Sequence, residues 1–106
     1  MNSLQIAFKT ETNLPEGKDE VSFLYGDNLF IVADGLGGEY LGKIAKEKAC
    51  YIIYESFFRH LSEVHSPEKA LTYALKEAND DVLNERRKFG GKMAASVSVV
   101  YIMDKI

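Results

Sequence analysis

The alternation of apolar and polar positions predicts four β-strands. The predicted strands cover residues 3–9, 21–25, 29–33 and 93–103. Apolar residues recur at every second position in three of these segments, whereas residues 29–33 are apolar without interruption, as in a strand covered on both faces. The turn residues 26–28 join the second and third strands as a hairpin. We expect the third strand to end at Asp34.

Between the hairpin and the last strand, apolar positions recur every three or four residues, which predicts two helices. The first begins near Tyr40 and ends near Val64. Ser66 and Pro67 then mark a new helix start, because serine accepts hydrogen bonds from free N–H groups and proline suits the first helical position. The glycines at 90–91 end the second helix.

This order of elements predicts an α/β (α+β) fold in which a helix pair covers one face of a sheet. Residues 29–33 and the second half of the strand 93–103 are apolar on both faces, so the uncovered face needs a second sheet or a partner chain. The chain also ends directly after a predicted strand. We therefore expect an incomplete domain, or a subunit that pairs with itself or with the missing part.

Composition and charge exclude several classes of protein. A chain of 106 residues with 46% apolar and 27% charged residues fits one globular domain. Its net charge of −3 argues against nucleic-acid and anionic-membrane partners. No apolar run approaches the length of a membrane span, and the start lacks a secretory signal, so we expect a cytoplasmic protein. The single cysteine, Cys50, excludes an internal disulfide and is expected to be buried.

The segment VADGLGG at 32–38 combines an acid with a glycine-rich turn. The Asp34 carboxylate and the Gly35 carbonyl are hard oxygen donors of the kind that Mg²⁺ or Mn²⁺ binds, and glycines let the backbone come close to a ligand. The alternative is a strand-to-helix turn in which Asp34 only caps the helix. Spacing alone does not separate the two readings.

Asp19 is the second candidate acid, because the hairpin would bring it near Asp34. It shares a strand face with Val21 and Tyr25, which favours an inward position. Two carboxylates in an apolar interior repel each other unless a cation lies between them. The alternative is a solvated acidic loop.

Other chemically active residues point to structural roles. His60 and His65 lie five positions apart, which does not place two ligands on one helix face, so we expect surface histidines. The basic run at 86–88 is typical of a solvated helix end. The aromatic residues expected to pack in the core are Tyr51, Tyr54, Phe57 and Phe58.

Taken together, these residues resemble the metal-dependent type 2C protein serine/threonine phosphatases. VADGLGG is similar to their central V-A-D-G-x-G-G signature, and Asp19 resembles the final acid of their earlier N-E-D segment. Residues 92–96 are similar to the Gly-Met-Gly-Thr-Thr-like start of a later strand. The resemblance covers nearly the whole chain. It implies that residues 1–106 are the amino-terminal portion of one such domain, a four-layer α-β-β-α sandwich.

The resemblance also implies a catalytic site with two Mg²⁺ or Mn²⁺ ions, which hydrolyses phosphoserine and phosphothreonine in proteins by metal-activated water. Asp34 would bridge both metals, the Gly35 carbonyl would bind one, and Asp19 would order metal-bound water or bind directly. The arginine that binds phosphate in the family is absent, and Lys18 could replace it as a point charge.

The later aspartates of the family have no counterpart before Ile106. We therefore expect residues outside this chain to complete the metal site, and this portion alone to be inactive. One alternative is a non-catalytic phosphatase-like module for regulation or protein interaction. Another is an unrelated α/β interaction domain that forms a homodimer.

Overall fold

The computed structural model of the protein describes residues 22–103. The elements, in chain order, are β1 (Ser22–Gly26), β2 (Leu29–Leu36), α1 (Gly38–Val64), α2 (Pro67–Phe89) and β3 (Ala94–Tyr101). The strands form one antiparallel sheet in the order β1-β2-β3. The predicted α/β fold with a hairpin, a helix pair and a final strand is confirmed, and the predicted strand 3–9 lies outside the described residues.

The hairpin between β1 and β2 turns at Asp27 and Asn28. Both have positive φ, 50° and 69°. A two-residue hairpin turn of type I′ needs this conformation at both central positions, and Asp and Asn adopt it more readily than most residues. The turn pairs Tyr25 with Phe30, whose rings stack. It therefore fixes the register, and with it the face of the sheet to which each side chain points.

Local residues set the ends of both helices. His65 adopts the left-handed conformation with φ of 53° and ends α1. The Ser66 hydroxyl accepts a hydrogen bond from the backbone N–H of Lys69 and begins α2, which ends at left-handed Gly90 with φ of 70°. These ends agree with the sequence prediction, whereas α1 begins slightly earlier than expected, at Gly38.

The core lies between the helix pair and one face of the sheet. Its buried residues are Leu29, Ile31, Ala33, Cys50, Ile53, Phe57, Ala70, Ala74 and Ala78. The alanines recur every fourth residue along α2, so α1 can approach this face closely. Phe57 is fully buried, and Tyr54 and Phe58 pack against the core as predicted. The prediction for Tyr51 is wrong, because this ring lies on the solvent side of α1 and is 68% exposed.

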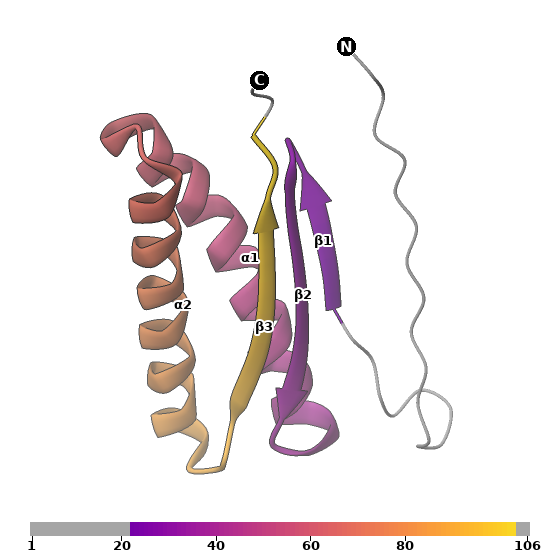
Figure 1. The fold of residues 1–106 in the computed structure, drawn as a ribbon. Coiled ribbons are helices and arrows are strands. Elements are labelled where there is room, and N and C mark those ends of the chain that lie inside the picture. The colour runs from indigo at the N-terminus through magenta and orange to yellow at the C-terminus, as the bar shows by residue number, and fades with distance from the viewer. Residues whose placement is uncertain (1–21, 104–106) are drawn as a thin grey trace.

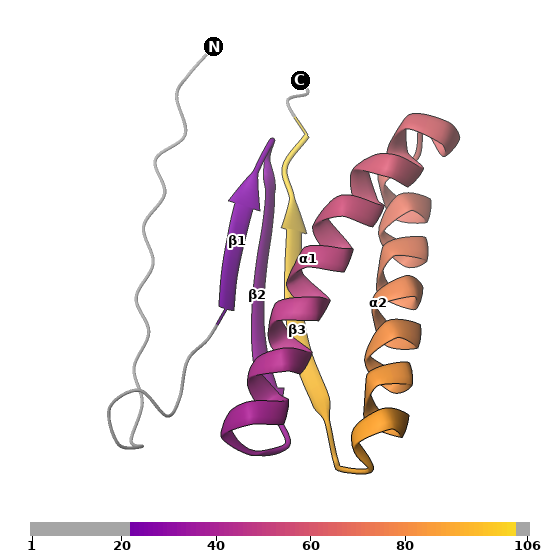
Figure 2. The ribbon, with the colours of Figure 1, turned by 180° about the vertical axis from the view of Figure 1, so that it is seen from behind.

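Both helices lie on the same side of the sheet (Figure 1, Figure 2), where α1 packs against all three strands and α2 against β3. The prediction that the helix pair covers one face only is confirmed. We call the other side the open face, because no described element packs on it. Its side chains are Tyr25, Phe30, Val32, Asp34, Leu36, Ala94, Ser96, Ser98 and Val100.

Candidate functional site

Asp34 lies within β2, paired with Ser96 of β3. The prediction that the strand ends at Asp34 is wrong, because pairing with β3 continues through Gly35 and Leu36. Ala33 points into the core, and strand side chains alternate between faces, so the Asp34 carboxylate projects from the open face. A paired strand therefore holds this exposed acid in a fixed position.

Asp34 does not cap helix α1. The cap position is occupied by Gly37, and within the described part of the chain no side-chain cap hydrogen bond is formed at this helix start. The reading in which Asp34 serves only as a helix cap is therefore wrong. Within residues 22–103 its carboxylate has neither a hydrogen-bond partner nor an ion-pair partner.

The glycines that follow Asp34 allow close contacts within the protein itself. A Cβ at Gly35 would lie 1.9 Å from the carbonyl oxygen of Gly42 in α1, and a Cβ at Gly37 would lie 2.9 Å from that of Lys92. Gly37 also has φ of 123°, which other residues rarely adopt. The sequence interpretation linked these glycines to a ligand. In the structure they bring α1 and the approach to β3 against the end of β2.

The described residues do not assemble a metal site by themselves. Within 22–103, no three His, Cys, Asp or Glu side chains lie close enough to hold one ion. Among the predicted metal ligands, the Asp34 carboxylate and the Gly35 carbonyl are described, whereas Asp19 lies outside the described residues, as does Lys18. A metal ion on Asp34 would need further ligands from outside residues 22–103.

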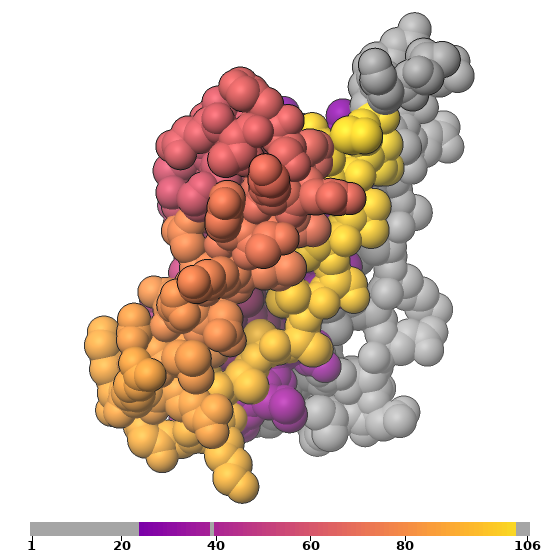
Figure 3. Space-filling view, turned by 60° about the vertical axis from the view of Figure 1, so that its left-hand side comes forward, coloured from indigo at the N-terminus to yellow at the C-terminus, as the bar shows by residue number. Residues whose placement is uncertain are grey.

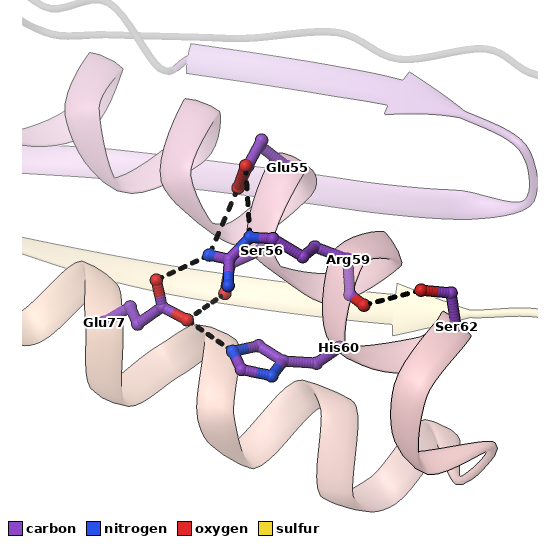
Figure 4. A network of polar contacts seen from close by, with 6 residues as sticks. All are labelled: Glu55, Ser56, Arg59, His60, Ser62 and Glu77. Atoms are coloured by element: carbon purple, nitrogen blue, oxygen red, sulfur yellow. Dashed lines mark hydrogen bonds and ion pairs between the residues drawn. The ribbon is translucent and has the colours of Figure 1, made fainter.

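A polar network between α1 and α2 centres on Glu77 (Figure 4). The Glu77 carboxylate accepts hydrogen bonds from the Ser56 hydroxyl at 2.7 Å and from the Arg59 guanidinium at 2.7 Å, and it contacts the His60 ring. Arg59 also pairs with Glu55 one turn earlier. The hydrogen bonds from Ser56, His60 and Arg59 lower the pKa of Glu77 to about 2, because they favour the ionised carboxylate.

This network joins the helices and does not activate a nucleophile. Ser56 is fully buried and donates its proton to Glu77 rather than to His60, whereas a nucleophilic serine donates to its base and faces the substrate. His60, expected at the surface, has a side chain only 19% exposed. Sequence reasoning missed Glu77, since its partners lie on the other helix. The only signal was that residues 56, 59 and 60 share one helix face.

Cys50 is buried in the core, as predicted. Burial raises the pKa of its thiol to about 11, since the thiolate would lose its hydration. Nucleophilic cysteines need the thiolate at neutral pH and access to substrate. Cys50 therefore has a packing role.

Comparison with known proteins gives no assignment. No protein-family model matches the chain, and no curated protein sequence matches it. Neither α1 nor α2 has an apolar stretch that could cross a membrane. The functional argument therefore depends on Asp34, the open face and the charges near them.

Proposed function

We propose that the chain contributes Asp34 to a two-metal centre that hydrolyses phosphoserine and phosphothreonine in proteins, as in type 2C phosphatases. One observation carries this proposal: Asp34 projects among apolar and small side chains of the open face, with no cationic partner in residues 22–103. A sheet face that carries several large apolar side chains, as the open face does, is normally covered by another layer of the protein or by a partner. If such a layer covered Asp34, its ionised carboxylate would be buried without a partner, which would strongly destabilise the protein. A cation bound to the carboxylate removes this free-energy cost.

The donors present suit Mg²⁺ or Mn²⁺. The Asp34 carboxylate and the Gly35 carbonyl are hard oxygens from one paired strand. The metal pair would supply Lewis acidity and a water nucleophile at neutral pH. The role of Asp34 is to provide a negative charge. Its strand pairing with Ser96 keeps that charge in a fixed position. We place this activity in the cytoplasm, with phosphoproteins as substrates.

A phosphatase-like module without catalytic activity is the second candidate. It is favoured by the finding that residues 22–103 contain no group of three metal-ligating side chains. Such a module would keep the helix pair and the open face for binding a partner protein. The two candidates differ in whether metal is held and phosphate is released.

Manganese binding tests the role of Asp34. The protein would be affinity-tagged, isolated from its source cells and titrated with Mn²⁺, with free Mn²⁺ followed by electron paramagnetic resonance. We expect Asp34→Asn to weaken binding at least about tenfold, as loss of a metal ligand does. The matched control Asp80→Asn removes an exposed acid from α2 and should leave binding unchanged. Equal affinities in the two variants would overturn the proposal.

Phosphate release from a phosphothreonine peptide separates the two candidates. Mn²⁺-dependent release by the wild-type protein, lost in Asp34→Asn and kept in Asp80→Asn, supports the enzyme. A protein that binds Mn²⁺ through Asp34 and releases no phosphate is the non-catalytic module.

A further inference from the structure

A hollow lies at the end of the sheet beside Asp34. Its volume is ≈ 400 Å³, and its lining residues are Leu36, Gly37, Arg86, Lys92 and Ala94. Leu36 and Ala94 are paired on the open face, and the next pair on that face is Asp34 with Ser96. Successive residues on one strand face are about 7 Å apart. Asp34 does not line the hollow, which therefore begins one residue pair beyond the carboxylate to which we assign the metal.

Two elements far from β2 in the sequence bring positive charge to this hollow. Arg86 comes from the last turn of α2, and Lys92 from the segment that leads into β3. Figure 3 shows atoms of the β2 to α1 region between the end of α2 and β3 at this end of the molecule. Folding thus places two cations at the end of β2, a strand that has one acid and no basic residue.

Both cations are available for a ligand. Arg86 and Lys92 are exposed, and within residues 22–103 neither forms an ion pair. Among the described residues, the Arg86 side chain is held by one hydrogen bond, from Nε to the carbonyl oxygen of Gly91 at 3.3 Å. This bond positions the guanidinium while leaving its terminal nitrogens to donate elsewhere.

We infer that Arg86 and Lys92 form the phosphate-binding part of the site and hold the phosphoryl group of a phosphoserine or phosphothreonine residue. This inference rests on the proposed function and names the residues that capture its substrate. The guanidinium matches the spacing of two phosphate oxygens, and the lysine ammonium adds a point charge. These two residues take the role for which the sequence alone suggested Lys18.

The test is a titration of the metal-free protein, in EDTA, with phenyl phosphate at constant ionic strength, followed by amide NMR. We expect saturable shifts at Gly37 and Lys92. Lys92→Gln and Arg86→Gln should each weaken binding about tenfold, the effect of losing one charge-assisted contact. Because Arg86→Gln also removes the bond to Gly91, Arg86→Lys provides a second variant that keeps the charge, and circular dichroism checks the fold of each.

Neighbouring basic residues provide matched controls. Arg87 donates to the Asn84 side chain at 3.1 Å, and Lys88 pairs with Glu85 at 3.4 Å, and neither lines the hollow. Arg87→Gln and Lys88→Gln should change the affinity less than about twofold.

Absence of saturable binding, or equal weakening in the control variants, would overturn the inference. EDTA removes metal from the measurement, so this failure leaves the manganese result for Asp34 unaffected. Conversely, a protein that binds phenyl phosphate and does not bind Mn²⁺ would support the phosphate-binding role of Arg86 and Lys92 and would reject the proposed metal centre.

Discussion

The backbone of Gly35 in β2 lies directly against the carbonyl group of Gly42 in α1. A Cβ at position 35 would fall 1.9 Å from the Gly42 oxygen and 2.5 Å from its carbon. These atoms belong to backbone, which cannot move aside as a flexible side chain can. The contact therefore sets the distance between the first helix and the part of the strand that carries Asp34.

Gly35→Ala should destabilise the protein by about 3 kcal/mol, the upper end of the usual cost of overpacking, because strand and helix must move apart. Gly90→Ala is the comparison variant, since Gly90 has positive φ but nothing within 4 Å of its added Cβ. It should cost only about 1 kcal/mol from backbone strain. Urea denaturation followed by circular dichroism measures both. Equal costs would show that the contact with Gly42 is not tight.

Ser56→Ala should destabilise the helix pair by about 1–2 kcal/mol, because it removes a buried donor from the Glu77 carboxylate. Ser62→Ala is matched to it, since the exposed Ser62 hydroxyl donates to the carbonyl oxygen of Arg59 on the same helix. We expect a change below about 0.5 kcal/mol for Ser62→Ala. Unfolding free energies that do not differ between the two variants would contradict a role for the network in holding α1 to α2.

The fold was predictable where local residues decide the backbone. Asp27 and Asn28 make the hairpin turn, Ser66 begins α2, and Gly90 ends it, each through the conformation or hydrogen bond that its own residue type favours. The end of β2 was not predictable in this way. Its last residues pair with β3, and no feature near Leu36 reveals a partner about sixty residues later.

The same distinction applies to the candidate site: adjacent residues predict one part of it, and tertiary packing brings the other part together. The VADGLGG segment singles out Asp34, because acid and glycines are adjacent in the chain. Glu77 and the pair Arg86 and Lys92 acquire their neighbours only through packing of α2 on α1 and β3. A charged helix end looks the same in the sequence whether it faces solvent or a hollow, so the basic run at 86–88 predicted only a solvated end.

Cys50 should react slowly with thiol reagents in the native protein. Burial both blocks access and raises the pKa of the thiol to about 11, so little thiolate forms near pH 8. We expect Ellman's reagent to react at least about a hundredfold more slowly in buffer than in 6 M guanidinium chloride, with a native rate that follows unfolding. Fast labelling of the native protein would show that the space around Cys50 opens locally.

The Glu77 network should make stability depend on pH. The pKa of Glu77 falls from its ordinary 4.5 to about 2 in the folded protein, chiefly through the Ser56 hydrogen bond. A carboxyl group with a lowered folded pKa adds stability above its unfolded pKa and loses it as the pH falls towards the folded value. The Glu77 side chain is 39% exposed, so solvent screening limits its contribution to about 1 kcal/mol.

The free energies of unfolding of wild type and Glu77→Gln should therefore differ most above about pH 5.5 and converge between pH 4.5 and 2. Glu63→Gln, an exposed change on α1, should follow wild type at every pH. If the gap between Glu77→Gln and wild type stayed constant down to pH 2, its ionised carboxylate would not be what stabilises the helix pair.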